Sequence, residues 1–391
     1  MIWLRYLLLI TFLLANYATK SQKCPIEEFQ GIQYNSKISL TKRQELKIIE
    51  VVFHIVYNEM NHNLSDGVIF SQLDILNKAF SDPGFHNFLS VPKEFQDDVA
   101  DPNIYFCLAK IDPNGNPTSG ITRKKTTKKS IGCRYDMGKR SVMFDRYGGT
   151  DIWNPKKYIN IYVSDRSDCP PAEAIFPEFA SDEEDGIILA PHLTGAQLTS
   201  YPFHMAKTLI HEMGHYFGLR HLAGGGGRDT CENFDAVDDT PIQKLNYTGC
   251  PTYPQISCGN SSMFMNYMSL VDDPCMFFFT QGQVERMNQA ISLYRSTLCI
   301  SSCDQNVSDE QLNFNFFPLG SGWYIQKIDQ GLWSGQLELF NLEGKKVWEQ
   351  QLYSQSGIFV PGLHRPLNQG IFILKIEAHS KTYFLKLFNT K

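Results

Sequence analysis

Three histidines between residues 211 and 221 constrain this chain more than any other feature of its sequence. His211 lies four residues before His215, Glu212 follows the first histidine, and Gly218 and His221 come further on. Because an α-helix has 3.6 residues per turn, residues four apart share one face, so both imidazoles can reach one metal ion. The sequence therefore predicts a helix that carries two ligands of a catalytic zinc site.

The rest of the segment supplies what such a site needs. Gly218 can adopt a positive φ, so the chain can turn after the helix and return His221 as the third ligand. Glu212 is predicted to be the general base for a water at the open fourth position. A helix start at 199–202 and apolar residues at every fourth position from 205 to 213 favour the helix. The alternative, ordinary polar residues on a solvated helix, rarely produces this spacing.

The length and charge of the chain narrow its class. With 391 residues it is long enough for two domains with separate cores. Its formal net charge of -5 argues against a nucleic-acid partner, because phosphate binding needs a basic surface. A basic run at 123–129 falls between strand-like segments, and we expect a solvated loop there.

The first residues have the order of a signal peptide. Arg5 precedes an apolar run from Tyr6 to Ala15, and small residues follow it. This run is too short to span a bilayer comfortably, and a buried helix is the alternative. We expect residues 1–20 to be removed, which leaves an exported protein without a transmembrane segment.

Landmarks across residues 48–300 occur in the order found in one family. They are strand-like segments at 51–57, 104–109, 120–123 and 158–163, the histidine motif, a turn at 266–270 and a segment at 279–287. With these landmarks the chain resembles the pappalysin/cytophagalysin metzincin metalloproteases. The resemblance implies an α/β catalytic domain over 49–300, with a mixed twisted sheet, two long helices and an irregular lower half. Helical spacing places the second helix at 71–80.

The resemblance also implies the activity. It implies a secreted zinc-dependent endopeptidase acting on proteins or peptides, which bind as extended chains beside an exposed edge strand. Two rival classes stay open: a non-catalytic secreted binding or adhesion protein with a vestigial zinc site, and a zinc hydrolase that acts on an amide outside proteins. A vestigial site would lack Glu212 or a ligand, and the sequence retains them all.

Three further residues are assigned from the family pattern. Met268 lies in a segment that looks like the methionine turn beneath the metal. Leu270 replaces a tyrosine that members usually carry, so we expect slower turnover. Asp273 occupies a position that in relatives lies in the pocket for the side chain after the scissile bond, which implies a preference for Arg or Lys.

An acidic loop follows the histidine motif. Asp235, Asp238 and Asp239 with Thr240 offer hard oxygen ligands, and members of the family bind calcium in this region. The alternative is that these side chains cap helices and turns. Both interpretations stay open.

The ten cysteines fit an exported protein, because disulfides persist in oxidising compartments. The resemblance implies the pairs Cys231–Cys258 and Cys250–Cys275 in the loop that follows the zinc helix. A second zinc site is the competing interpretation, but these four residues include no Cys-x-x-Cys pair.

Cysteines outside this loop are less constrained. We expect Cys299 and Cys303 to bridge at the domain border. Cys24 lies in an extension at 21–48 that we interpret as a propeptide, in which a thiolate could occupy the open metal position. The alternative is that Cys24 pairs with one of the unassigned residues Cys107, Cys133 and Cys169.

The chain changes character after residue 303. Short alternating strands at 335–340, 347–352, 370–376 and 382–387 predict a small all-β sandwich domain over 304–391. Its order of elements resembles the C-terminal sorting domains of type IX secretion cargo. This resemblance implies the type IX machinery as a partner and a secreted or cell-surface location. An accessory domain that binds substrate or carbohydrate is the alternative.

Overall fold

The structure is a computed structural model. It describes residues 46–82, 85, 90–196, 203, 205–223, 231 and 235–300, together with strands between 314 and 389. The predicted signal peptide at 1–20, Cys24, and all but the last three residues of the predicted extension at 21–48 lie outside the described residues. Within those ranges, no helix has the length and apolar character needed to cross a bilayer.

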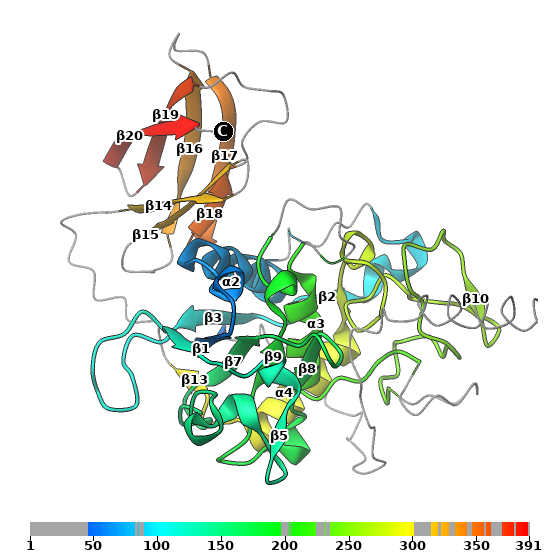
Figure 1. The fold of residues 1–391 in the computed structure, drawn as a ribbon. Coiled ribbons are helices and arrows are strands. Elements are labelled where there is room, and N and C mark those ends of the chain that lie inside the picture. Colours follow the sequence, from blue (N-terminus) through cyan, green and yellow to red (C-terminus); the bar gives the residue numbers. More distant parts are fainter. Residues whose placement is uncertain are drawn as a thin grey trace, which may run out of the picture.

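A seven-stranded mixed sheet forms the centre of residues 46–300 (Figure 1). The strand order is β13 (Cys299–Ile300), β1 (Lys47–Tyr57), β7 (Ile159–Ser164), β9 (Ile187–Leu189) and β8 (Ala172–Ala174). Two further strands pair with β1: β3 (Ile104–Leu108) pairs with its first half and β4 (Ile121–Lys125) with its second half. Strand β1 runs parallel to β3, β4 and β7, whereas β13 and β8 are antiparallel to their neighbours. This mixed sheet agrees with the predicted α/β architecture.

Strand β1 is buried on both faces, which accounts for its nearly unbroken apolar sequence. Because side chains alternate along a strand, its odd-numbered residues from Ile49 to Ile55 enter the main core with the helices. On the opposite face, Val56 packs in a second cluster with Ile131 and Tyr162. The sheet is therefore a rigid layer between two apolar clusters.

Among the described residues, three α-helices accompany the sheet: α2 (Asp66–Ser81), α3 (Lys207–Tyr216) and α4 (Gln281–Tyr294). Helix α2 contains the predicted 71–80 but begins earlier, after an extended N-cap at Ser65. The predicted start of the zinc helix at 199–202 lies outside the described residues, and α3 begins only at Lys207. Ala206 has φ 62° in the left-handed region, so the helix cannot include Met205 as we predicted.

The basic run at 123–129 is only partly a loop. Arg123, Lys124 and Lys125 belong to β4, where they pair with 55–57 of β1. Our prediction of a solvated loop is wrong for these three residues. Only Ile121 of β4 is buried, and the residues after it are intermediate or exposed, so the basic side chains reach the surface, where Arg123 pairs with Asp66 and Lys124 with Asp145.

Shorter elements complete residues 46–300. The two-residue strands are β2 (Val99–Ala100), β5 (Tyr135–Asp136), β6 (Lys139–Arg140), β10 (Ile256–Ser257), β11 (Asn260–Ser261) and β12 (Phe279–Thr280). The 3-10 helices are η1 (Met60–His62), η3 (Lys93–Asp98), η4 (Ile131–Cys133), η5 (Ser141–Met143), η6 (Asp145–Tyr147), η7 (Pro177–Phe179), η8 (Pro191–Leu193) and η9 (Asp273–Cys275). In the described residues between α3 and α4, only β10, β11, η9 and β12 interrupt irregular chain, which agrees with the predicted irregular lower half.

Disulfides hold this irregular region. The structure joins Cys231 to Cys258 and Cys250 to Cys275, with Cα atoms 5.5 Å and 5.7 Å apart, which are the two pairs that the resemblance implies. Each closes a loop of about 25 residues, for which chain entropy predicts a stabilisation of about 3 to 4 kcal/mol. Loop closure therefore compensates for the scarcity of regular structure here.

Three other cysteines have defined states. Cys133 pairs with Cys169, and Cys107 is also disulfide-bonded. Cys299 is an exposed free thiol, so the predicted bridge to Cys303, which lies outside the described residues, is wrong.

The C-terminal strands form two antiparallel sheets. One contains β14 (Phe314–Leu319), β15 (Gly322–Lys327) and β18 (Gly357–Val360), and the other contains β17 (Lys346–Gln355), β16 (Trp333–Asn341), β19 (Gly370–Ala378) and β20 (Lys381–Asn389). Alternate residues of β16 and β19, such as Leu337, Leu339, Leu374 and Ile376, are fully buried. The described elements between 314 and 389 are all strands, as the sequence predicts.

We expect acid to destabilise the sheet through His54. Its fully buried ring contacts Oγ1 of Thr122 at 2.8 Å and Oδ1 of Asn160 at 3.0 Å. Burial lowers the pKa of His54 from 6.5 to about 4. Since the unfolded chain binds this proton first, the stability present above pH 6.5 is lost as the pH falls from 6.5 towards 4, by about 2 to 3 kcal/mol.

Urea unfolding of the wild type and His54→Gln at pH 7 and pH 4.5 measures this contribution. The glutamine variant has no proton to take up at this position, so its free energy of unfolding should fall less between the two pH values. Titration of the other histidines is common to both proteins and cancels. Equal losses in the two proteins would contradict the assignment to His54.

Candidate metal centre

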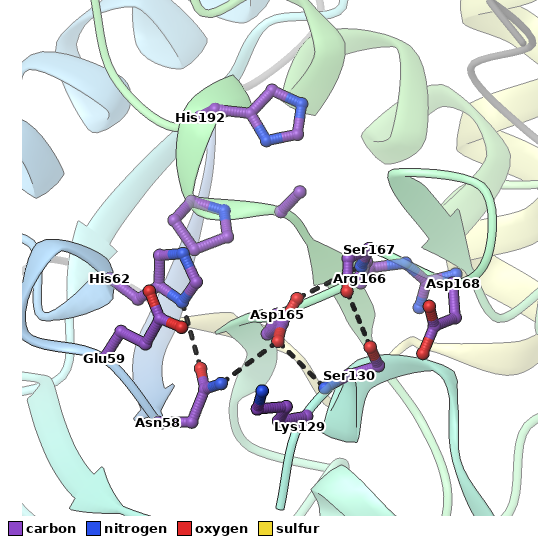
Figure 2. Close-up of a pocket in the computed structure, with 12 residues that line it drawn as sticks. Asn58, Glu59, His62, Lys129, Ser130, Asp165, Arg166, Ser167, Asp168 and His192 are labelled. Carbon is purple, nitrogen blue, oxygen red and sulfur yellow. Dashed lines mark hydrogen bonds between the residues drawn. The ribbon is translucent and has the colours of Figure 1, made fainter.

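A polar pocket of about 410 Å³ lies at the carboxyl ends of β1, β7 and β9 (Figure 2). At its base Asp165 accepts hydrogen bonds from Nδ2 of Asn58 at 3.2 Å and from the backbone N–H of Ser130 at 2.9 Å. These polar groups satisfy one another. Among the described residues, this pocket does not bring three possible metal ligands within reach of one ion. The predicted zinc site therefore lies elsewhere.

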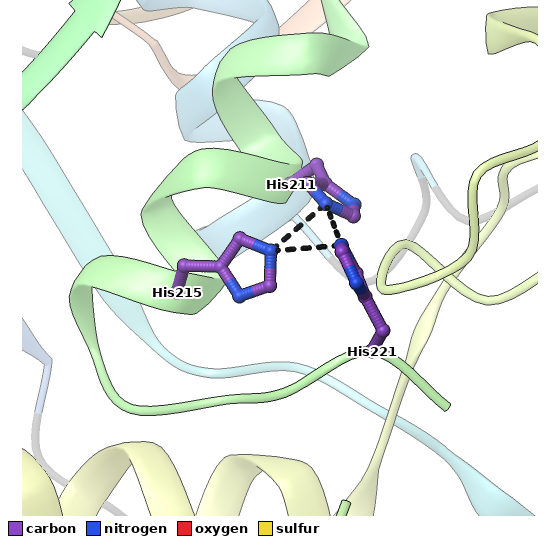
Figure 3. Close-up of side chains that lie close together, drawn as sticks. All are labelled: His211, His215 and His221. Atoms are coloured by element: carbon purple, nitrogen blue, oxygen red, sulfur yellow. Dashed lines mark hydrogen bonds between the residues drawn. The ribbon is translucent and has the colours of Figure 1, made fainter. Parts of the chain in front are cut away.

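Three imidazoles meet at the end of α3 (Figure 3). The Nε2 atoms of His211 and His215 are 3.0 Å apart, and Nε2 of His221 lies 3.1 Å from the first and 3.2 Å from the second. All three side chains are buried. The structure therefore brings together the three ligands that the sequence predicts.

The turn after α3 brings the third ring to the first two. The helix ends at Tyr216, and Gly218 adopts φ 85°, in the left-handed region that glycine enters without steric penalty. Its N–H donates to the carbonyl of His215 at 2.8 Å. The next residue, Leu219, donates its N–H to the carbonyl of Gly214 at 2.9 Å, so the chain folds back along the helix end before it reaches His221.

Backbone carbonyls orient the rings. Nδ1 of His211 lies 2.8 Å from the carbonyl of Tyr267, and Nδ1 of His215 lies 2.7 Å from the carbonyl of Leu219. A carbonyl only accepts, so each Nδ1 must carry the hydrogen and each Nε2 must present its lone pair to the centre. Tyr267 and Leu219 could not be predicted from the sequence, since a contact through the main chain leaves no signature in the side-chain type.

Burial favours the neutral form of two of the rings. It lowers the pKa of His215 to about 4 and the pKa of His221 well below its ordinary value. Neutral nitrogens whose lone pairs face one another at 3.0 to 3.2 Å repel unless a cation lies between them. Tetrahedral ligands at a zinc–nitrogen distance of about 2.0–2.1 Å are separated by about 3.3–3.4 Å, so this donor set fits zinc.

Glu212 lies on the same helix as the first two ligands. Its side chain is fully buried, and it follows His211 directly. Neighbouring residues of an α-helix point about 100° apart, so this carboxylate does not share the direction of the ligand before it. The position suits a group that handles protons beside the metal and leaves a coordination position open.

Met268 packs against the zinc helix between its two ligands. Gly214 lies between His211 and His215 in the sequence of α3. A Cβ on this glycine would overlap Sδ of Met268, so the two residues are in close contact. The turn is fixed by Asn266, whose Oδ1 accepts the backbone N–H of Met268 at 2.8 Å. Met268 therefore lies directly against the helix that carries His211 and His215.

The carboxylates of the acidic loop accept hydrogen bonds from nearby groups of the protein. Asp239 accepts hydrogen bonds from Oγ1 of Thr280 at 2.7 Å and from the N–H of Gly282 at 2.7 Å, so it caps the start of α4. Asp235 accepts the hydroxyl of Thr240 and the N–H of Val237, and burial raises its pKa to about 7.

Asp238, the remaining carboxylate of this loop, is exposed. Among the described residues, the histidine triad alone places three ligand atoms within reach of one ion. The hydrogen bonds of Asp235 and Asp239 favour the capping interpretation, while calcium binding by Asp235, Asp238, Asp239 and Thr240 stays a prediction. A capping carboxylate and a calcium ligand carry the same sequence signal, because both are aspartates in a loop.

Asp273 has a contact that the sequence did not predict. It is fully buried, and its Oδ2 accepts the backbone N–H groups of Met205 at 3.0 Å and of Lys207 at 3.2 Å. Lys207 is the first residue of α3, so this carboxylate satisfies a donor at the start of the zinc helix. The contact fixes the orientation of the carboxylate next to that helix.

The mixed sheet, the histidine-bearing helix and the underlying methionine turn are features of a metalloprotease. A model of the family described as Peptidase M43, pregnancy-associated plasma protein-A, matches residues 145–292. Mature mirolysin of Tannerella forsythia, solved in complex with a cleaved peptide, is 35% identical with a TM-score of 0.59, and the match covers 66% of this chain and 100% of that one. The chain therefore belongs to the M43 family of metalloproteases.

Further relatives agree with this placement. A promirolysin mutant of Tannerella forsythia is 35% identical with a TM-score of 0.60, covering 65% of this chain and 83% of that chain. The extracellular metalloprotease of Arthroderma otae is 39% identical over 26% of this chain, and the chain spans only 37% of that relative's length. That of Arthroderma gypseum is 26% identical over 61% of this chain and 70% of its own length. Membership of a metalloprotease family implies a catalytic zinc, for which the triad supplies the ligands.

Proposed function

We propose that the chain is a secreted zinc-dependent endopeptidase. The observation that carries this proposal is the convergence of three Nε2 atoms at 3.0 to 3.2 Å beside the buried Glu212. Relatives named extracellular metalloproteases and the mirolysin complex with a cleaved peptide support it. We infer that His211, His215 and His221 hold the ion.

The residues of the site divide the chemistry between them. A bound zinc ion supplies Lewis acidity, which polarises the scissile carbonyl and eases the loss of a proton from water. Glu212 accepts that proton as the water attacks and delivers it to the leaving amine, so its carboxylate acts first as base and then as acid. Burial of Glu212 excludes bulk water and strengthens its interaction with the proton that it moves.

Strand β8 supports an extended peptide as the substrate. In the described sheet β8 pairs with β9 alone, so its other edge offers backbone donors and acceptors. Phe176, just after β8, packs against the ring of His215 with ring centroids 5.3 Å apart. A peptide added to this edge would therefore pass beside the metal ligands.

Cleavage of casein by the purified protein tests the function. We expect conversion to peptides by internal cuts, because an edge strand binds a chain along its length and needs no free end. Zinc-loaded protein that left casein intact but hydrolysed a small amide would favour the rival zinc hydrolase. Zinc-loaded protein that did neither would favour the binding or adhesion protein with a vestigial site.

We extend the proposal to specificity through Asp273, which would favour Arg or Lys after the scissile bond. A charge-assisted hydrogen bond to a buried carboxylate accounts for such a preference. Asp273→Asn keeps an oxygen for the N–H groups of Met205 and Lys207 and removes the charge. In a peptide library we expect the ratio of kcat/KM for Arg over Leu to fall at least about tenfold. A wild type that preferred aliphatic residues at this subsite would contradict the assignment.

Leu270 is expected to limit the rate. Its side chain is buried beside the methionine turn and carries no hydroxyl with which to stabilise negative charge on the substrate. We therefore propose slower turnover than in members that carry tyrosine at this position.

The proposal also covers export. We infer that 1–20 is a signal peptide, 21–48 a propeptide, and 304–391 a β-sandwich that directs type IX secretion to the medium or the cell surface. The two antiparallel sheets of the C-terminal strands support a sandwich, and the extracellular relatives support export. Export of a chain lacking 304–391 would contradict the sorting role and favour an accessory domain.

A further inference from the structure

The end of the zinc helix requires support from outside the helix. The last carbonyls of any α-helix have no intrahelical donor. In α3 the chain leaves the helix after Tyr216, and the turn through Gly218 must then deliver His221 to the metal. The Leu219 carbonyl of this turn is held by His215, itself a ligand. The carbonyl just before it, that of Gly218, is held from another element.

That element is α4. Arg286, on the middle of α4, donates from Nε to the carbonyl of Gly218 at 2.7 Å, across 68 positions of sequence. Its Nη1 donates to the carbonyls of Asp235 at 3.0 Å and Ala236 at 3.2 Å. The side chain is only 4% exposed. One guanidinium therefore ties the turn that carries the third ligand to the loop at 235–236.

A guanidinium suits this task for two reasons. Its donors are held in one plane at fixed angles, so bonds made in two directions fix the separation of their acceptors. Its positive charge also lies at a helix C-terminus, where the macrodipole favours cations. A lysine would keep the charge but could not hold both acceptors in this geometry.

Arg295 shows how a second arginine of this region differs. It follows α4 directly and donates to the carbonyl of Tyr216 at 3.2 Å. Its charge is paired with the buried Asp185, and its guanidinium lies over the ring of Tyr216 at 3.5 Å. Arg295 therefore anchors the last residue of α3, whereas Arg286 reaches the turn beyond it.

We propose that Arg286 is a positioning residue for the third metal ligand. By holding the carbonyl of Gly218, it fixes the path of the turn and thereby the place of the His221 ring relative to the other two. The proposal rests on the triad binding zinc, as the proposed function does, and it does not depend on which bond the protein hydrolyses.

Zinc affinity measured against a chelating dye tests this role without any assay of activity. We expect Arg286→Gln and Arg286→Lys to weaken zinc binding about 10- to 100-fold, which is the usual effect of removing a group that orients a ligand. The matched control is Ile291→Ala, which lies on the same helix, is buried in the main core and has no polar side-chain group that could hold a carbonyl of the turn. Wild-type affinity in both arginine variants, or an equal loss in the Ile291→Ala control, would overturn the proposal.

A double-mutant cycle separates positioning from a general loss of stability. If Arg286 acts through His221, Arg286→Gln should change zinc affinity less than about twofold in a His221→Ala background, because the ring that it positions is gone. Cobalt bound in place of zinc should also show an altered visible spectrum in Arg286→Lys. A full additional loss in the double variant would overturn the proposal. A wild type that binds zinc tightly but cleaves nothing would refute the proposed peptidase while leaving this test intact.

Discussion

Replacement of Glu212 by glutamine should lower kcat for peptide cleavage by about 10²- to 10⁴-fold, the usual contribution of a positioned acid–base group. Glutamine has nearly the shape of glutamate but cannot take a proton from water. The expected loss corresponds to about 3 to 5 kcal/mol of transition-state stabilisation. The measurement is the steady-state cleavage of one fluorogenic peptide by zinc-loaded wild type and variant.

Zinc content decides how that loss is interpreted. The three predicted zinc ligands are histidines, and Glu212 is not one of them. Glu212→Gln should therefore bind one zinc per chain with an affinity close to that of the wild type. A variant that is slow because it has lost zinc would make Glu212 a part of the metal site. Undiminished turnover with zinc bound would remove it from the mechanism.

Replacement of His215 by alanine should abolish zinc binding at micromolar zinc, and with it the cleavage of casein. Removal of a group that only orients a ligand weakens metal affinity about 10- to 100-fold, so loss of a direct ligand should exceed 100-fold. The wild type treated with a chelator should lose activity in the same way and regain it when zinc is added back. His215→Ala should regain nothing.

His192 provides the control for this substitution. It is an exposed histidine of the polar pocket and lies outside the triad (Figure 2). His192→Ala should keep both zinc and activity. Equal losses in His192→Ala and His215→Ala would show that the assay reports a general effect of removing histidines, and the triad would lose its special role.

The ligands could be predicted from the sequence because their geometry is local. The spacing of His211 and His215 equals one helical turn, and a single glycine explains the return of His221. The mixed sheet and the place of Met268 beneath the zinc helix were expected from the family resemblance. The helix start was missed because it depends on Ala206 in a left-handed conformation, which no residue type at that position signals.

Long-range contacts account for most of what the sequence did not reveal. In the sequence, Asp239 has the same signal as a calcium ligand. Its capping role depends on hydrogen bonds from Thr280 and Gly282, which are 41 and 43 positions away. The same holds for Arg286, whose partners are main-chain carbonyls of distant residues. Such contacts depend on tertiary packing, and a local pattern carries no trace of them.

X-ray absorption at the zinc edge of the purified protein tests the central claim most directly. If three imidazoles converge on one ion, the spectrum should show a single zinc per chain with three nitrogen ligands at about 2.0–2.1 Å and a light atom in the remaining position. A protein purified without zinc that fails to take it up, or a zinc ion bound by sulfur or by fewer than three imidazoles, would contradict this account.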